Sequence, residues 1–255
     1  MHNLSYLLRT SIPVLLGVAV AAPLAHADIP GFQDFSNFTI NNGDGGAAPT
    51  VSIPLGKINL INGGGEQRSI FDNTPQNITQ FTASFTFQGQ GGNPDGTCFV
   101  IQNNAAGASA LGFQDGYSGM IKSAAVALEL DNSGNTNTAL YTSGNLGGAT
   151  SSSPVALFTD DPINVSLAYN GSLLNETLVD STTLASFNTS YVVNLPSVVG
   201  TTTAIVGFTA SSNFGSSQSI SNFQFTSVPE PASIVLFGAG AMSLLAYLSM
   251  RRSCA

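Results

Sequence analysis

Apolar and polar residues alternate along much of the middle of this 255-residue chain, with the period of a β-strand. In residues 80–87, Phe81, Phe85 and Phe87 fall on one side of the alternation, and polar side chains fall on the other. Because successive side chains of a strand point to opposite faces, this pattern predicts an antiparallel strand with one buried face. Residues 163–169 repeat the pattern.

Turn signals and further apolar runs extend the prediction to a complete β-domain. An Asn-Gly pair at 170–171 leads into residues 173–179, which predicts a hairpin. Residues 203–209 are apolar on both faces apart from threonines, as in a strand covered on both sides, and residues 220–226 form a last strand. No window between the two terminal segments has a sustained helical period. The sequence therefore predicts one all-β domain at residues 28–227.

The N-terminal segment is typical of a secretory signal. Arg9 precedes an apolar run at residues 12–22, and small residues end the segment. A retained membrane helix is the alternative, but Pro13, Pro23 and the shortness of the apolar run disfavour it. We therefore expect residues 1–27 to be a signal peptide that is removed on export.

The C-terminal segment, residues 228–255, contains Pro229-Glu230-Pro231, then an apolar stretch at residues 234–250, then two arginines. At ~1.5 Å per residue the stretch is near the lower limit for a transmembrane helix, and the arginines after it favour a cytoplasmic end. This arrangement resembles the PEP-CTERM sorting signal. The resemblance implies recognition by an exosortase in the inner membrane of a Gram-negative bacterium, removal of the tail, and delivery to the cell surface or exopolysaccharide matrix. A plain C-terminal anchor is the alternative.

The charge and the scarce residue types narrow the possible functions. The chain has 6 Lys plus Arg against 14 Asp plus Glu, a net charge of −8, which leaves too few cations to bind nucleic-acid phosphates. His2 and His26 are both in the predicted signal, so the mature body has no histidine for catalysis or metal binding. Cys98 and Cys254 would be on opposite sides of the membrane, which excludes a disulfide between them. We expect Cys98 to be a small buried apolar residue.

Two carboxylates belong to the predicted strand at residues 124–131. Glu129 and Asp131 are two positions apart, so their side chains project from the same face. Carboxylates held this close repel each other unless a cation, a proton or hydrogen-bond donors lie between them. A hard metal ion such as calcium or manganese accounts for the pair, and the asparagines that follow supply further oxygen atoms. A solvated acidic pair at the end of a strand accounts for the spacing equally well.

Seven short motifs follow one another in an order that resembles the legume-type (L-type) lectins. The motifs are residues 56–60, 71–75, 81–87, 94–96, 98–103, 125–131 and 206–210. Each motif is weak by itself, but the shared order extends over residues 32–226. The resemblance implies a concanavalin-like jelly-roll sandwich, with a flat sheet, a curved sheet and binding loops above the concave face.

Matched residue by residue, the resemblance implies a sugar site and a metal site. Asp95 in the Pro-Asp-Gly motif corresponds to the aspartate that accepts hydrogen bonds from sugar hydroxyls. Gly112 corresponds to the loop glycine whose N–H meets the sugar. Glu129 and Asp131 correspond to the first two metal-binding carboxylates. Asn135 corresponds to the asparagine that binds calcium and also contacts the sugar.

The chain also departs from the plant members of this family. Ser133 is found where they have an aromatic residue, and residues 137–141 contain neither the further aspartate nor the histidine of the second metal site. We therefore expect at most one calcium ion. Tyr117 and Tyr141 are the nearby aromatic candidates for contact with a sugar, and core packing is the alternative role for both.

Three classes of function fit the sequence to different degrees. The retained Asp95, Glu129, Asp131 and Asn135 favour an exported, non-enzymatic, lectin-like protein that binds a polysaccharide or another glycan. The missing ligands favour a structural protein of the exopolysaccharide matrix that has lost its site. A glycoside hydrolase is disfavoured, because no second glutamate follows the Glu-x-Asp pair to act as the acid of a retaining enzyme. The sequence determines neither the sugar nor the oligomeric state.

Overall fold

A computed structural model describes residues 28–228, apart from residues 45, 47, 92–95 and 132. The predicted signal peptide, the predicted sorting tail with Pro229-Glu230-Pro231, and Asp95 lie outside the described residues. Within the described part of the chain, no helix has the length and apolar character needed to cross a membrane.

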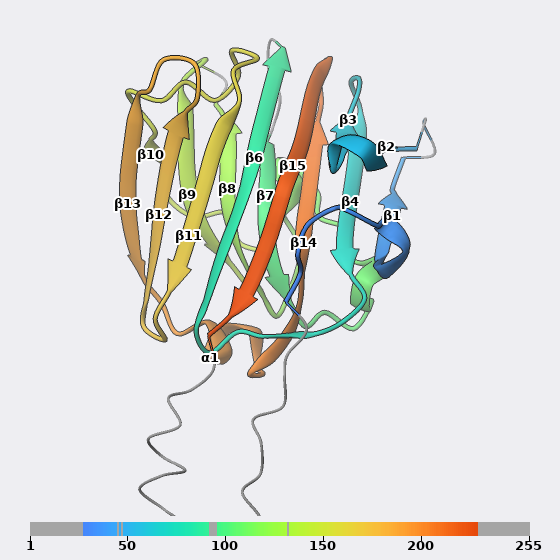
Figure 1. Ribbon diagram of the computed structural model, residues 1–255, viewed down its shortest axis with the longest axis vertical. Helices are drawn as coiled ribbons and strands as arrows, with labels where there is room; N and C mark the ends of the chain where they lie inside the picture. Colours follow the sequence, from blue (N-terminus) through green and yellow to red (C-terminus); the bar gives the residue numbers. More distant parts are fainter. Residues whose placement is uncertain (1–27, 45, 47, 92–95, 132, 229–255) are drawn as a thin grey trace, which may run out of the picture. The chain divides into compact units, whose positions relative to one another are not determined.

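The described residues form a sandwich of two antiparallel β-sheets (Figure 1). The eight-stranded sheet has the order β1 (Phe38–Asn42), β4 (Glu66–Asp72), β14 (Thr203–Ser212), β7 (Gly96–Gln102), β8 (Ser123–Leu130), β9 (Thr136–Thr142) and β10 (Thr150–Ser151), with β5 (Gln76–Asn77) also paired to β14. The seven-stranded sheet has the order β13 (Ser186–Val192), β12 (Leu173–Asp180), β11 (Ile163–Tyr169), β6 (Phe81–Gly91), β15 (Ser216–Ser227), β3 (Lys57–Ile61) and β2 (Thr50–Ser52).

Helices are few in the described part of the chain. They are α1 (Leu195–Val199) and the short 3-10 helices η1 (Phe35–Asn37), η2 (Ile53–Leu55), η3 (Gly107–Ser109) and η4 (Gln114–Gly116). The prediction of an all-β sandwich is therefore confirmed.

Strand β6 shows how the alternation of the sequence builds the core. Phe81, Phe85 and Phe87 are buried together with Ala83, and the polar residues that alternate with them are more exposed. β11 alternates in the same way and pairs with β6, so that Val165 lies opposite Phe85. The apolar faces of the two sheets then pack on each other and leave water together, which is the main stabilising contribution to such a sandwich.

Aromatic rings from both sheets meet in the centre of the core. Phe208 of β14 contacts Phe85 of β6 and Phe223 of β15 edge to face, each with ring centroids 4.8 Å apart. Phe99 of β7 joins them at 5.7 Å from Phe208. Each edge-to-face contact of this kind stabilises the fold by roughly 0.5–1.5 kcal/mol beyond the effect of burying apolar area.

A second apolar cluster, here named the outer cluster, covers the outer face of the eight-stranded sheet. It consists of Phe71, Cys98, Val100, Ala110, Tyr117, Met120, Ala125, Ala127, Ala139 and Tyr141. Alternate residues of β7, β8 and β9 form its base, and the connection between β7 and β8 supplies Ala110, Tyr117 and Met120. Cys98 is fully buried in it, as expected, and its thiol donates to the Asp115 carbonyl at 3.0 Å.

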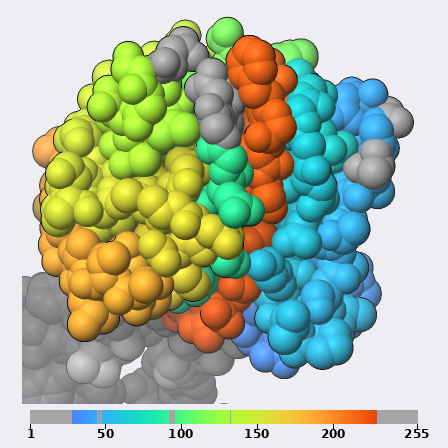
Figure 2. Space-filling model, turned by 90° about the horizontal axis from the view of Figure 1, so that it is seen from above, coloured from blue at the N-terminus to red at the C-terminus, as the bar shows by residue number. Residues whose placement is uncertain are grey.

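One end of the sandwich is here named the loop pole. The strands that end there are β3, β6, β8 and β14, and the strands that begin there are β4, β7, β9 and β15. It is the upper end in Figure 1. Figure 2 shows the sandwich from above, with β15 in red beside the cyan segment that includes β3 and β4. A Cβ on Gly64, after β3, would be 3.1 Å from the Gly215 nitrogen, before β15. The described ends of the chain lie at the opposite end, where Ser227 pairs with Phe81.

Candidate functional site

A row of four paired residues crosses the eight-stranded sheet at the loop pole. Ser211 of β14 pairs with Gly96 of β7, Gly96 pairs with Glu129 of β8, and Glu129 pairs with Asn137 of β9. Neighbouring strands are ~4.8 Å apart, so the row brings together segments that are distant in the sequence. Asp95 directly precedes Gly96 in the sequence and lies outside the described residues.

Glu129 is buried against the outer cluster. Its side chain accepts a hydrogen bond from the Tyr141 hydroxyl, and the two residues are 8% and 2% exposed. Burial raises the pKa of Glu129, the hydrogen bond from Tyr141 opposes the rise, and the charge of Asp131 adds to it. Burial, and then the hydrogen bond to Glu129, raise the pKa of Tyr141 far above its ordinary value. Tyr141 therefore keeps its proton and is the donor of the pair.

Asp131 accepts four hydrogen bonds from the loop that follows it and from the start of β9. Its Oδ1 accepts from the backbone N–H groups of Ser133 at 2.8 Å and Asn135 at 2.9 Å. Its Oδ2 accepts from the side-chain amides of Asn135 at 3.0 Å and Asn137 at 3.4 Å. The hydrogen bond from the Asn135 side chain is the largest of the effects that lower the pKa of Asp131. An ionised Asp131 therefore fixes the position of Asn135.

Gly112 lies in the turn that covers β14. A Cβ on Gly112 would be 1.9 Å from the carbonyl oxygen of Gly116, so only glycine fits there without movement of the backbone. The N–H of Gly116 donates to Ser211 Oγ at 3.0 Å. This contact puts the turn over the row, two strands away from Glu129.

Comparison with protein families gives two matches. The family model of the legume lectin domain matches residues 65–235, which is more than half of the chain. The chain belongs to the legume lectin domain family. A second family model, the PEP-CTERM protein-sorting motif, matches residues 227–253. A comparison with curated proteins found no match.

Solved structures of plant lectins share the fold of this lectin domain. The lectin from Bauhinia forficata in complex with GalNAc is 15% identical, with 78% of this chain and 96% of that chain covered and a TM-score of 0.62. Arcelin-5, a lectin-like defense protein from Phaseolus vulgaris, is 15% identical, with 80% and 98% covered and a TM-score of 0.63. Lectin I-B4 from Griffonia simplicifolia, in a metal-free form, is 13% identical, with 78% and 98% covered and a TM-score of 0.60. The predicted legume-lectin-like sandwich is confirmed.

The contacts of the expected metal ligands in the lectin domain do not fit a bound cation. The Glu129 carboxylate accepts the Tyr141 hydroxyl beside the outer cluster, and both oxygens of Asp131 accept N–H groups. Asn135 directs its amide N–H, not its oxygen, at Asp131. Among the described residues, no three His, Cys, Asp or Glu side chains gather into a possible metal site. Hydrogen-bond donors therefore occupy Oε2 of Glu129 and both oxygens of Asp131.

The loop pole of the lectin domain also carries an exposed aromatic residue that the sequence motifs did not indicate. Tyr117 and Tyr141, the two aromatic candidates, are buried in the outer cluster, so core packing is their role. Phe214 lies between β14 and β15 and is 63% exposed. The available signal was the triplet Asn213-Phe214-Gly215 between two predicted strands, because a tight turn leaves its central side chain in solvent.

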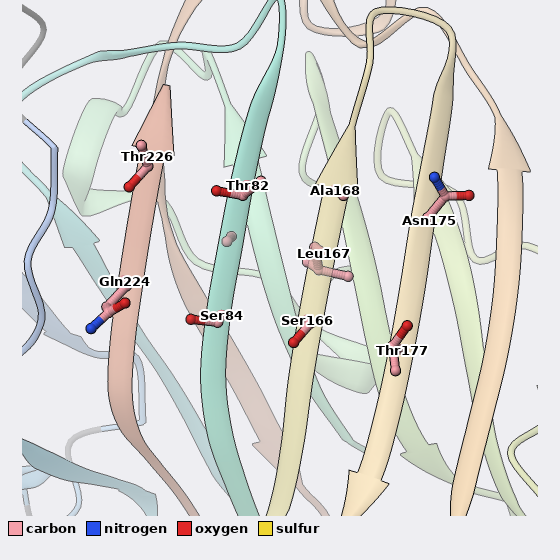
Figure 3. Close-up of a pocket in the computed structure, with 10 residues that line it drawn as sticks. Thr82, Ser84, Ser166, Leu167, Ala168, Asn175, Thr177, Gln224 and Thr226 are labelled. Atoms are coloured by element: carbon pink, nitrogen blue, oxygen red, sulfur yellow. The ribbon is translucent and has the colours of Figure 1, made fainter. Parts of the chain in front are cut away.

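A shallow trough of ≈ 260 Å³ lies on the outer face of the seven-stranded sheet, which is not the sheet that carries Asp131. Figure 3 shows its lining, in which the small side chains of Ser84 on β6 and Ser166 on β11 lie between Gln224 of β15 and Thr177 of β12. The lining residues are Thr82, Ala83, Ser84, Ser166, Leu167, Ala168, Asn175, Thr177, Gln224 and Thr226. None of them is charged, so the trough offers no group for acid–base chemistry or ion pairing.

Proposed function

We propose that this legume lectin domain is a non-enzymatic glycan-binding module. The observation that carries the proposal is the row at the loop pole. The row joins three neighbouring strands of one sheet, β14, β7 and β8. These strands carry the turn with Phe214, the start of β7 after Asp95, and the loop after Asp131. Binding residues of sandwich folds are commonly on such loops, where a rigid sheet positions them.

Each residue of the proposed sugar site has a distinct role. Asp95 accepts hydrogen bonds from sugar hydroxyls, and a charged acceptor makes stronger hydrogen bonds than a neutral one. Asn135, positioned by Asp131, and the backbone of the Gly112 turn supply further hydrogen bonds. Phe214 supplies the apolar surface that ligand sites combine with a few polar groups. This combination suits an uncharged sugar, which presents hydroxyls at its rim and C–H groups on its faces.

The proposed module does not hydrolyse its glycan. Retaining glycosidases use two carboxyl groups about 5–5.5 Å apart, one as the nucleophile and the other as the acid. In the lectin domain the Glu129 carboxylate is held by Tyr141, and the oxygens of Asp131 are held by four N–H donors. Both carboxylates are therefore already engaged within the protein. The calcium ion that the resemblance implied has no part in the proposal, because the same contacts occupy its expected ligands.

The PEP-CTERM match supports an exported and sorted protein. We propose that residues 1–27 are removed as a signal peptide and that an exosortase recognises Pro229-Glu230-Pro231 in the inner membrane. Residues 234–250 hold the chain in that membrane transiently. The lectin body at residues 28–227 then reaches the cell surface or exopolysaccharide matrix of a Gram-negative bacterium.

A glycan array with the full chain, purified in a mild detergent, tests the binding proposal. We expect binding to a restricted set of glycans and a loss of about tenfold or more in affinity for Asp95→Ala, because the charged acceptor is removed. Phe214→Ala is expected to weaken binding about threefold to tenfold through loss of the aromatic surface. The matched control is Val192→Ala, since Val192 is 89% exposed on the edge strand β13 of the other sheet. Its affinity is expected to equal that of the wild type.

A structural protein of the exopolysaccharide matrix is the second candidate function. The departures at Ser133 and residues 137–141 favour it. A folded chain that binds nothing on the array, including the polysaccharide of its own host, would refute the lectin proposal and favour this one.

A further inference from the structure

We infer that this lectin domain orders its glycan-site loop without a metal ion. In its place, the Tyr141 hydroxyl binds one oxygen of Glu129, and N–H groups of Ser133, Asn135 and Asn137 bind both oxygens of Asp131. The family resemblance assigned both carboxylates to a cation. The inference rests on the proposed function only in that the 131–135 loop is the proposed sugar loop. The ordering of the loop itself does not require a sugar.

The hydrogen bond between Tyr141 and Glu129 is built into the register of β8 and β9. Glu129 pairs with Asn137, whereas Tyr141 pairs with Ala125, so three pairs lie between the two partners along the strands, and only one of the three is on the same face. That pair is Ala127 with Ala139, two small residues on the same face. Their side chains leave the space across which the hydroxyl contacts the carboxylate. Two larger residues at this pair would separate the partners.

Packing against Tyr117 holds the Tyr141 ring in the position from which its hydroxyl contacts Glu129. The ring stacks on Tyr117, with the centroids 5.7 Å apart. The Tyr117 hydroxyl in turn donates to the Ser123 carbonyl at 2.8 Å and accepts the Gly144 N–H at 3.3 Å. A cation that took over the Glu129 carboxylate would displace a buried hydroxyl from its acceptor, which is unfavourable where water does not replace it.

The loop after β8 is closed by its own donors. Asp131 binds two backbone N–H groups with one oxygen and two side-chain amides with the other. The Asp131 N–H also donates to the Asn135 carbonyl at 3.0 Å, and the Gly134 N–H donates to the Asp131 carbonyl at 2.9 Å. A carboxylate has about four lone-pair positions, and the loop and Asn137 of β9 together donate to Asp131 four times. A metal ion is therefore not required to hold Asn135 in place.

Metal titration of the full chain in a mild detergent tests this inference directly. We expect no heat of binding for Ca²⁺ or Mn²⁺ in isothermal titration calorimetry, and the same Tm in EDTA and in millimolar calcium to within about 1 °C. A site of micromolar affinity would raise Tm by several degrees at millimolar ion, because a ligand that binds the native state stabilises it. A calcium-dependent rise in Tm would overturn the inference.

Hydrogen–deuterium exchange shows whether Asp131 itself orders the loop. The Ser133 and Asn135 amides are expected to be protected in EDTA as well as in calcium, and Asp131→Asn is expected to speed their exchange about tenfold or more in both. Protection that appears only with calcium would contradict the inference.

Substitution of Tyr141 tests its role as a positioning residue. Tyr141→Phe is expected to lower Tm and to speed exchange in the 131–137 loop, with or without calcium, because Glu129 loses its donor. Tyr169→Phe is the matched control: Tyr169 is also buried, and its hydroxyl donates to the Gly171 carbonyl at 2.7 Å, but it belongs to the other sheet. It is expected to lower Tm without changing exchange in the loop. If Tyr141→Phe does not fold, the wild-type titration and Asp131→Asn still decide the question.

The outcomes separate this inference from the proposed function. The titration and the exchange experiment need no glycan, so a silent array would refute the lectin proposal and leave the inference standing. Glycan binding that disappears in EDTA would overturn the inference and leave the lectin proposal intact.

Discussion

Glu176 of β12 is a carboxylate inside the sandwich, where it is 1% exposed. Both of its oxygens lie 2.8 Å from the Thr138 hydroxyl of β9, and Oε2 also accepts from the Tyr191 hydroxyl at 2.9 Å. Burial raises the pKa of Glu176 to about 7, and the two hydroxyl donors oppose the rise only in part. At the scale of one residue, the two sheets are therefore linked by a carboxyl group that titrates near neutral pH.

This residue makes the stability of the fold depend on pH. The pKa of Glu176 is 4.5 ordinarily and about 7 in the fold, so the unfolded chain loses this proton first as pH rises. Glu176 therefore contributes to the free energy of unfolding in full below its ordinary pKa of 4.5. This contribution, about 3 kcal/mol, is lost as the pH rises through the pKa of about 7 in the fold. We expect Glu176→Gln to flatten this decline and to be more stable than the wild type at about pH 8. Guanidinium unfolding of the wild type and the variant at about pH 5 and pH 8 measures the decline and the stability at pH 8. A decline in Glu176→Gln that parallels the wild-type decline would contradict the assignment.

At the scale of strands, the sequence predicted what depends on local alternation and missed what depends on pairing. Residues 163–169 coincide with β11, because alternation determines which face of a strand is buried. The strand predicted at residues 203–209 continues to Ser212, because pairing with β4 and β7 holds its polar end. The contact of Tyr141 with Glu129 could not be predicted, since it depends on the register of β8 and β9. The spacing of Glu129 and Asp131 predicts two adjacent carboxylates, but it does not predict the hydrogen-bond donors that reach them.

Gly207 shows how tightly β14 is held between its neighbours. A Cβ on Gly207 would be 2.0 Å from the Ile70 carbonyl oxygen and 2.7 Å from the Phe71 Cα, both on β4. Gly207→Ala therefore forces β4 and β14 apart in the middle of the eight-stranded sheet, and we expect a loss of about 3 kcal/mol or more in the free energy of unfolding. Gly215→Ala is the control, because a Cβ on Gly215 meets nothing within 4 Å. Chemical denaturation measures both variants, and a similar small effect for the two would show that β4 and β14 separate easily.

At the scale of the whole domain, the two ends of the sandwich differ in what they carry. The loop pole carries Phe214, the loop after Asp131 and the start of β7. The opposite end carries both described ends of the chain, where Ile29 pairs with Phe225 and Ser227 pairs with Phe81. The described C-terminal end of the domain therefore lies away from the proposed sugar site. This polarity suits a module that binds glycans while it is held at a surface.

The polarity of the domain predicts where an added protein blocks binding. A globular carrier that replaces the tail after Val228 is expected to change glycan affinity by less than about twofold, because it is joined at the end opposite the loop pole. The same carrier inserted into the turn between Asn213 and Gly215 is expected to abolish binding, since it would cover the loops next to Gly96 and Asp131. Titration of each fusion with a glycan identified on the array measures the affinities, and the Tm of each shows whether the domain is folded. Equal affinity of two folded fusions would move the sugar site away from the loop pole, and the uncharged trough on the seven-stranded sheet would then be the surface to test.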